Sequence, residues 1–218
     1  MLMSNEAAWV PLFVDVTKRR VVIVGGGRVA TRKLEKLPRV CHIVVIAPVI
    51  TTSIKERIER FGGTWTARIF QPSDIQAGDL VIAALDDTKT RYAIAAAAAR
   101  CGAWYNDASA VTDGDVLLPA SGSWGMFTWA LSTGGASPRL LKLVKDEWDT
   151  EYGMLGRVAA DLLQYRDLVK GLLPTQRQRE VFWRTYLPED TLARIRRGEW
   201  AQIKEEMDNA ISRLRAES

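Results

Sequence analysis

A glycine-rich segment near the N-terminus carries the clearest chemical signal in the sequence. The apolar run 21–24 is followed by Gly25, Gly26 and Gly27, and then by residues that favour a helix. A strand, a glycine turn and a helix in this order can bind a dinucleotide, because the helix N-terminus offers free N–H groups and a positive dipole end to a pyrophosphate. The spacing G-x-G-x-x-A assigns Gly25 to the tight turn, Gly27 to the close approach of the ligand and Ala30 to the helix–strand contact. A turn that serves packing alone is the competing interpretation.

The second predicted strand, 41–47, ends without the acidic residue that usually binds the adenine ribose in NAD-binding folds. Residues 46–49 are Ile, Ala, Pro and Val, which include neither an acid nor an arginine that would indicate NADP. The ribose is therefore held by backbone groups or not at all, and this position leaves the choice of cofactor open.

Polar residues follow two later apolar runs. Asp86 and Asp87 come after the first of them, and Asn106 and Asp107 end the second. In open parallel sheets ligands bind outside the carboxyl ends of the strands, so these side chains are expected at the same edge as the glycine turn. Asp86 and Asp87 either contact a cofactor or cap the next helix, and the sequence does not separate the two roles.

A second glycine segment, 132–138, has the sequence Ser-Thr-Gly-Gly-Ala-Ser-Pro and precedes a predicted helix over 139–148. Ser137 is a good N-cap, and Pro138 fits the first helical position. Two glycines, three hydroxyl groups and a helix N-terminus suit an anionic ligand. A plain loop with a capped helix is equally compatible with the pattern.

The elements that must position these residues alternate between strands and helices, which predicts an α/β fold with a Rossmann-like parallel sheet. The expected strands are 21–24, 41–47, 65–70, 79–84 and 103–107, and the expected helices are 30–37, 52–61 and 89–100. Beyond residue 107 the pattern changes. Two strands, 116–120 and 126–131, are expected to form a hairpin through the turn 121–123, and the remainder up to residue 215 is mostly helical in pattern.

The composition is that of an ordinary globular protein. The chain has 218 residues, of which 47% are hydrophobic and 26% charged, and its net charge is +4. This charge is too small to indicate nucleic acid, although it suits an anionic small substrate. No run reaches the roughly 18 apolar residues of a membrane span, and residues 1–8 are too polar and short for a signal peptide. We therefore expect a cytoplasmic protein that binds neither membrane nor nucleic acid.

The residues that commonly bind metal ions are scarce. Cys41 and Cys101 are the only cysteines and lack a C-x-x-C spacing, so both are predicted to be buried free thiols. His42 is the only histidine, which excludes a site that needs two histidines. No metal ligands are predicted.

With both glycine segments placed, the chain resembles the siroheme synthase N-terminal family. The segments that carry the resemblance are 11–13, 24–33, 46–48, 83–87, Asn106, 119–120 and 131–138. The family contains precorrin-2 dehydrogenases, some of which are also sirohydrochlorin ferrochelatases. The resemblance implies NAD-dependent oxidation of the tetrapyrrole precorrin-2 to sirohydrochlorin. It also implies a homodimer of subunits with an NAD-binding Rossmann-like domain (1–112), a small β dimerisation region (113–148) and a helical C-terminal domain (149–218).

The resemblance and the motifs together assign candidate site residues. Those expected to contact NAD are Gly25, Gly27, Arg28, Val29, Ala30, Pro48, Val49, Asp86 and Asn106. Those expected to contact the carboxylates of precorrin-2 are Thr133, Gly134, Gly135 and Ser137. Because the family contacts the dinucleotide through residues that match Arg28, Val29, Pro48 and Val49, the resemblance also accounts for the missing ribose acid.

One departure from the family pattern concerns the acid–base group. The family usually has an aspartate three residues after the asparagine, and that place is Ser109 in this chain. Either Asp107 serves instead, or dehydrogenation needs no carboxylate here, or activity is reduced; Asp107 and Ser109 are the candidate catalytic residues. The serine favours dehydrogenation over iron insertion. The alternative functions are a nucleotide-sensing regulatory module and a non-catalytic relative that binds a tetrapyrrole.

Overall fold

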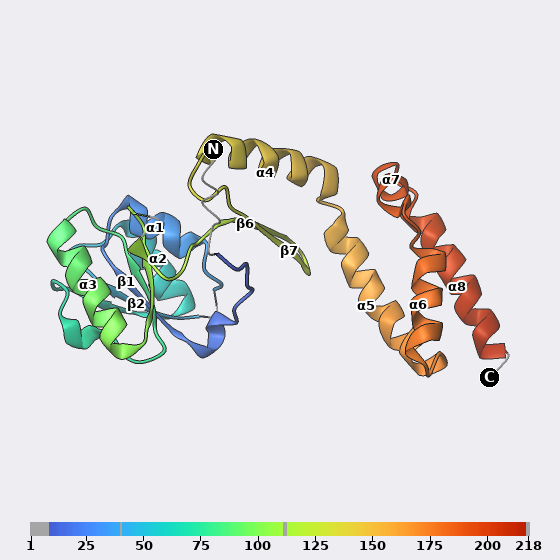
Figure 1. Cartoon of the computed structure of the whole chain (residues 1–218), viewed down its shortest axis with the longest axis horizontal. Helices are drawn as coiled ribbons and strands as arrows, with labels where there is room; N and C mark the ends of the chain where they lie inside the picture. Colours follow the sequence, from blue (N-terminus) through green and yellow to red (C-terminus); the bar gives the residue numbers. More distant parts are fainter. Residues whose placement is uncertain (1–8, 40, 111–112, 217–218) are drawn as a thin grey trace, which may run out of the picture. The chain divides into compact units, whose positions relative to one another are not determined.

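The computed structural model describes residues 9–39, 41–110 and 113–216. The chain forms two compact units, one ending at Pro119 and the other beginning at Ala120 (Figure 1). The finer division into three parts, with boundaries after residues 112 and 148, remains a prediction. Residues 1–8 and 111–112, on which the signal-peptide argument and the first boundary depend, lie outside the described residues.

The first unit is a parallel five-stranded sheet in the order β3-β2-β1-β4-β5. Its strands are β1 (Arg20–Val24), β2 (His42–Ile46), β3 (Thr64–Thr66), β4 (Leu80–Ala83) and β5 (Trp104–Asp107). Its helices are α1 (Arg28–Glu35), α2 (Thr52–Phe61) and α3 (Thr88–Cys101), with short 3₁₀ turns η1 (Val16–Lys18) and η2 (Pro72–Asp74). The predicted Rossmann-like α/β fold is confirmed.

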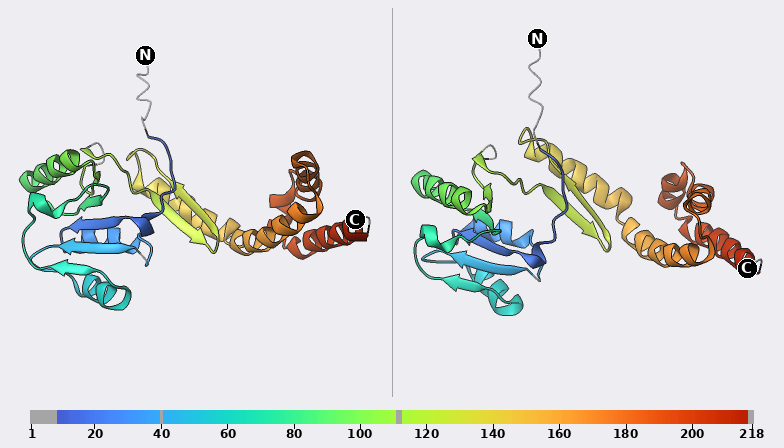
Figure 2. Two further views of the ribbon diagram at one scale, coloured as in Figure 1. Left: turned by 90° about the horizontal axis from the view of Figure 1, so that it is seen from below. Right: turned by 60° about the horizontal axis from the view of Figure 1, so that its bottom comes forward.

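Both faces of this sheet are covered, which explains why its central strands are continuous β-branched runs. Val21 and Ile23 of β1 pack with residues of α1 and α2, including Ile54. Val22 and Val24 point to the other face and pack with Ile94 and its neighbours on α3. The views in Figure 2 show α3 and α2 on opposite sides of the sheet. The alternating side chains of β1 thus belong to two separate cores.

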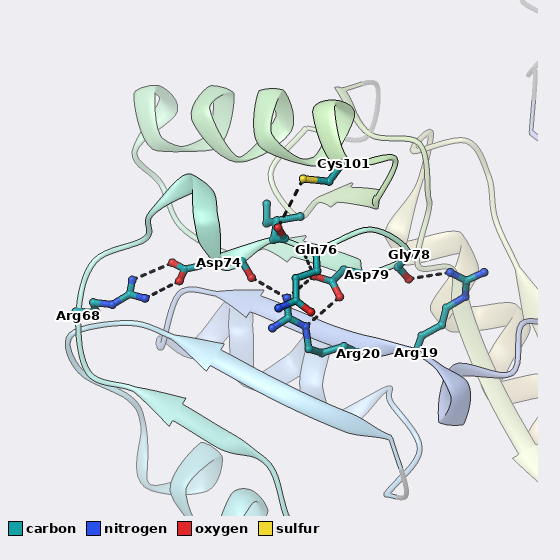
Figure 3. A network of polar contacts seen from close by, with 9 residues as sticks. Arg19, Arg20, Arg68, Asp74, Gln76, Gly78, Asp79 and Cys101 are labelled. Atoms are coloured by element: carbon teal, nitrogen blue, oxygen red, sulfur yellow. Dashed lines mark hydrogen bonds and ion pairs between the residues drawn. The ribbon is translucent and has the colours of Figure 1, made fainter.

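A network of polar contacts joins the amino-terminal end of β1 to the segment before β4 (Figure 3). The Arg20 guanidinium donates to both carboxylate oxygens of buried Asp79, at 3.0 and 2.6 Å, and to the Asp74 carbonyl. Arg68 forms a bidentate pair with Asp74, and its hydrogen bonds lower the pKa of that carboxyl. Arg68 lies two residues beyond the end of β3 at Thr66. The strand predicted over 65–70 is therefore too long. Beyond Thr66 the chain turns towards η2.

Over residues 120–216, the described part of the second unit, the chain forms a hairpin and five helices. Its elements are β6 (Ala120–Trp124), β7 (Phe127–Leu131), α4 (Pro138–Tyr152), α5 (Leu155–Leu172), α6 (Gln176–Tyr186), α7 (Thr191–Arg196) and α8 (Trp200–Ala216). The prediction of a strand over 116–120 with a turn at 121–123 was wrong. Val116 and Leu118 pack on the core of the first unit instead, and the turn lies at Gly125, whose φ of 60° suits glycine.

Helices α5 to α8 share an apolar core whose most deeply buried members include Val169, Ile203 and Met207. Among the described residues, no helix has both the length and the apolar character needed to cross a membrane. Cys41 is buried and Cys101 partly buried, and both thiols are free. Within the same described ranges, no three His, Cys, Asp or Glu side chains are grouped so that they could hold a metal ion.

Candidate functional site

The first two glycines of the turn are required by the protein itself. Gly25 has a φ of 121°, and a Cβ there would lie 2.2 Å from the Ala84 carbonyl oxygen. A Cβ on Gly26 would lie 2.0 Å from the Val49 carbonyl oxygen. These approaches bring together the loops that follow β1, β2 and β4, at the point where the strand order reverses. Ligands bind at this point in open α/β sheets.

Gly27 is different, because none of the described residues requires a glycine there. Its backbone is extended, with φ −88° and ψ −167°, a conformation open to any residue. A Cβ would meet no atom within 4 Å. Arg28 beside it is exposed, Val29 is partly buried, and Ala30 is fully buried against the sheet. The open space at Gly27 therefore lies on the solvent side of the loop, where a ligand can reach the backbone.

Gly27 is the N-cap of α1 and offers no side-chain cap, and the first turn of the helix contains no acidic residue. The other two helices of the first unit are capped by side chains, α2 by Thr51 and α3 by Asp87, whereas in the second unit α4 is capped by Ser137 and α5 and α7 have no side-chain cap. The first N–H groups of α1 thus lack the usual acceptor, and Arg28 adds a positive charge beside them. This is the arrangement that binds a phosphate or pyrophosphate.

The loop after β2 lies against the glycine turn. Pro48 and Val49 are exposed, Val49 at 77%, and the Thr51 N–H donates to the Gly26 carbonyl over 3.0 Å. The hydroxyls of Thr51 and Thr31 are 2.8 Å apart and link α2 to α1. The predicted neighbours Gly27, Pro48 and Val49 are thus brought together. A ribose here would meet backbone and apolar groups rather than a carboxylate.

The aspartates after β4 have separate environments. Asp87 accepts a hydrogen bond from the Thr90 N–H over 2.8 Å and caps α3. Asp86 is exposed at the same strand end. The capping alternative is therefore realised at Asp87, while Asp86 faces solvent beside the switch point.

Asn106 is almost completely enclosed, with 3% of its surface exposed. Its Oδ1 accepts from Lys33 Nζ at 3.2 Å, and its Nδ2 donates to the Val116 carbonyl at 2.7 Å. Asn106 thus connects α1 to the chain that returns after β5. Burial leaves little of its side chain for a cofactor to touch.

Asp107 is also buried, with 4% exposed, and accepts hydrogen bonds from several donors. Arg91 forms an ion pair with it at 3.1 Å, the Tyr105 hydroxyl donates over 3.1 Å, and the Ser109 and Ala110 N–H groups donate over 2.8 and 3.0 Å. Burial alone would raise the pKa of Asp107, but these donors together hold it below the ordinary value. Burial, together with this carboxylate, raises the pKa of Tyr105. A carboxylate held in this way is a weak base.

Ser109 lies on the turn that these hydrogen bonds close, and its side chain is exposed. The structure therefore separates the two candidate catalytic residues. Asp107 faces inward and anchors the turn, and Ser109 faces solvent at the carboxyl edge of the sheet.

The second glycine segment belongs to the other unit and forms a self-contained turn. Gly134 and Gly135 have φ of 61° and 91°. The Thr133 hydroxyl accepts from the Ser137 N–H over 3.2 Å, and the Ser137 hydroxyl accepts from the Leu140 N–H over 3.2 Å. The hydroxyls of Thr133 and Ser137 thus serve the turn and the cap, as the plain-loop alternative predicts. Their contact with a substrate stays a prediction.

Sequence reasoning missed three residues that the structure places at this edge. Lys33 bonds Asn106, Arg91 pairs with Asp107, and Thr31 bonds the hydroxyl that caps α2. Lys33 and Thr31 follow the glycine turn on the predicted helix, so their positions on that helix could have predicted that they lie near the site. Arg91 could not be found this way, because its partner lies on another element.

Two family models match the chain. A family described as "Putative NAD(P)-binding" matches residues 12–120, which hold the sheet, the glycine turn and the strand-end loops. A model of the sirohaem synthase dimerisation region matches residues 152–211. The chain belongs to the siroheme synthase N-terminal family. The match to the dimerisation region lies within the segment predicted as the helical C-terminal domain, 149–218.

Curated relatives of this family include three siroheme synthases. Those of Pseudomonas paraeruginosa and Nitrosococcus oceani are each 30% identical, over 94% and 93% of this chain and 44% of each relative's length. That of Pseudomonas fluorescens is 33% identical over 80% of this chain and 38% of the relative. The chain thus spans less than half the length of these relatives.

A solved structure named "SirC, precorrin-2 dehydrogenase" has the same fold. It is 23% identical in sequence, with a TM-score of 0.67 over 90% of this chain and 100% of its own. The likeness extends beyond the sheet into the helices of the second unit, because it covers nearly the whole chain.

Proposed function

We propose that this chain is an NAD-dependent precorrin-2 dehydrogenase that oxidises precorrin-2 to sirohydrochlorin. The observation that carries the proposal is the uncapped N-terminus of α1 beside Gly27. Gly25 and Gly26 are fixed by contacts inside the protein, whereas Gly27 has open space where a Cβ would be. A glycine that the fold does not need, at a helix N-terminus whose side-chain cap is missing, fits a bound pyrophosphate.

The remaining cofactor contacts follow from the loops at the same edge. The exposed Pro48–Val49 loop would receive the adenine ribose, which accounts for the lack of an acid there. The segment from Ala84 to Asp86 lies against Gly25 and leads into α3, and the nicotinamide would lie on this side of the glycine turn. When bound, NAD supplies the hydride acceptor.

The protein must then orient the substrate and take up a proton. We infer that Asp107 does not accept this proton directly, because it is buried, carries a lowered pKa and accepts hydrogen bonds from Arg91, Tyr105 and the turn. Its role is to hold the turn that presents Ser109. Precorrin-2 carries several carboxylates, and the hydroxyls and glycines of Thr133, Gly134, Gly135 and Ser137 are proposed to bind one of them.

A homodimer is part of the proposal. The match to the sirohaem synthase dimerisation region supports it. Helix α4 supports it too, because none of its residues is buried, and its Leu140 and Leu143 are 52% and 49% exposed. Sedimentation equilibrium should give twice the mass of the chain, and a monomer at micromolar concentration would count against this part.

Turnover is the direct test of the function. Purified protein mixed with precorrin-2 and NAD should produce NADH and the absorbance of sirohydrochlorin. No turnover under conditions in which SirC works would contradict the proposal, and NAD binding without turnover would indicate a non-catalytic relative. Asp107→Asn should lower both stability and turnover, whereas Ser109→Ala should lower turnover alone if the hydroxyl contacts the substrate.

A further inference from the structure

Lys33 reaches from α1 across the sheet to β5, where its Nζ donates to Asn106 Oδ1 over 3.2 Å. The amide nitrogen of Asn106 donates to the Val116 carbonyl over 2.7 Å. An ammonium group can only donate and a carbonyl can only accept. These two partners therefore fix which way round the Asn106 amide lies, inside a nearly closed environment.

A second lysine on the same helix holds the same returning chain. Lys36 Nζ donates to the Pro119 carbonyl over 3.0 Å. The backbone of Val116 is held by β5, because its N–H also donates to the Tyr105 carbonyl over 3.0 Å, and α1 contacts this arrangement at Asn106 through Lys33 and at Pro119 through Lys36. Because α1 also begins at the glycine turn, one short rigid element connects the proposed pyrophosphate site to the end of β5.

The charge of Lys33 is costly in this position. Burial lowers its pKa, and the neighbouring cations Lys36 and Arg32 lower it further, while Asp107 opposes the shift. The hydrogen-bonded acceptor of its Nζ is a neutral amide rather than a carboxylate. Methionine would fill similar space without burying a charge, so packing alone does not account for a lysine here.

We propose that Lys33 is a positioning residue of the site, which orients the Asn106 amide and thereby keeps the end of β5 and the segment 116–119 in place relative to the cofactor loop. The effect on catalysis rests on the proposed function, whereas the effect on Asn106 does not. The two parts can therefore be tested separately.

The first test observes Asn106 directly. The chain has three asparagines, Asn5, Asn106 and Asn209, so ¹³C-labelled asparagine gives three carboxamide signals that substitution of Asn5 and Asn209 assigns. Between about pH 7 and pH 11 the Asn106 signal should shift as Lys33 loses its proton, with a midpoint below that of ordinary lysines at about 10.4. In Lys33→Met the shift should vanish.

Lys36→Met is the matched control for this titration. It removes the contact with Pro119 and one neighbouring cation but leaves the Lys33 contact, so the Asn106 shift should persist with a higher midpoint. An Asn106 signal that does not move in the wild type, or that moves equally in Lys33→Met, would overturn the proposal whether or not the protein is an enzyme.

The second test uses NAD-dependent turnover of precorrin-2. Lys33→Met should lower kcat by about tenfold or more, as a small displacement of site groups does, while the Kd for NAD stays within about twofold. Lys33→Arg, which keeps a charged donor, should restore part of kcat. A kcat for Lys33→Met equal to that of the wild type would refute the positioning role, and circular dichroism confirms that each variant is folded.

Discussion

Replacement of Gly27 by aspartate should stabilise the free protein and strongly weaken its binding of NAD. Gly27 is the uncapped N-cap of α1, and a side chain there would meet no atom within 4 Å. Aspartate is a better N-cap than glycine by a few tenths of a kcal/mol, and a negative charge at a helix N-terminus adds about 0.3–1 kcal/mol. Gly27→Asp should therefore gain about 0.5–1 kcal/mol and raise the Tm by about 2–6 °C.

The same carboxylate would compete with the pyrophosphate for the N–H groups of α1 and repel it. Two unit charges about 4 Å apart near a protein surface interact by roughly 4 kcal/mol. Because salt and water screen part of this repulsion, we expect a loss of about 3 kcal/mol, which is more than a hundredfold in Kd. Stability and affinity are thus predicted to change in opposite directions at one residue.

Differential scanning fluorimetry and calorimetric titration with NAD measure the two effects. Gly27→Asn is the matched control, because it supplies a similar cap without the charge and should lose much less affinity. A Kd for Gly27→Asp within about threefold of the wild type, or a Tm several degrees lower, would show that the pyrophosphate site or the open space at Gly27 has been misassigned.

Three further predictions concern the fold of the first unit. Gly25→Ala should destabilise the first unit by about 3 kcal/mol or more, because its Cβ would lie 2.2 Å from a carbonyl oxygen at a positive φ; an unchanged urea midpoint would contradict this. Asp79→Asn should cost about 3 kcal/mol by leaving the Arg20 guanidinium without its carboxylate, and an Arg20→Met, Asp79→Leu double variant should recover much of that loss. The pKa of Asp74 is lowered, first by its hydrogen bonds with Arg68. The ionised carboxylate therefore stabilises the native state at pH values above the ordinary pKa of 3.8, and this stabilisation is lost as the pH falls through the native pKa. Asp74→Asn should therefore lose less stability between pH 5 and pH 2 than the wild type, and parallel urea midpoints for the two proteins across that range would disprove this assignment.

The parallel sheet and the glycine turn were predictable because local patterns determine them. The runs that became β1, β2 and β4 are continuous and apolar, as strands buried on both faces must be. The spacing correctly predicted that Gly25 is needed for the turn, whereas the need for glycine at Gly26 comes from the approach of the Val49 carbonyl and was not predicted. Element types were therefore right where the signal lies within a few residues.

The errors arose where distant contacts decide the local structure. Val116 to Pro119 has the composition of a strand, but its apolar side chains pack on the first core and its carbonyls accept from α1 and Asn106. The surroundings of Asp107 were out of reach for the same reason. The family pattern made Asp107 a candidate acid–base group, and that role stays a prediction, but its ion pair with Arg91 joins two different elements, and no spacing rule connects those residues.

The central position of β1 has a consequence for how the chain folds during synthesis. Ile23 pairs with Val45 on one side and with Ile82 on the other, so β1, which is synthesised before the other strands of this sheet, completes its ladder only after about 60 more residues have followed. Until β4 arrives, the half-sheet of β1, β2 and β3 presents an apolar, unpaired edge of four or five residues, which is a template for wrong pairing. A translational pause that leaves β1, β2 and β3 outside the ribosome while β4 is still inside it should therefore increase aggregation of the nascent chain, whereas a pause after β4 has emerged should not.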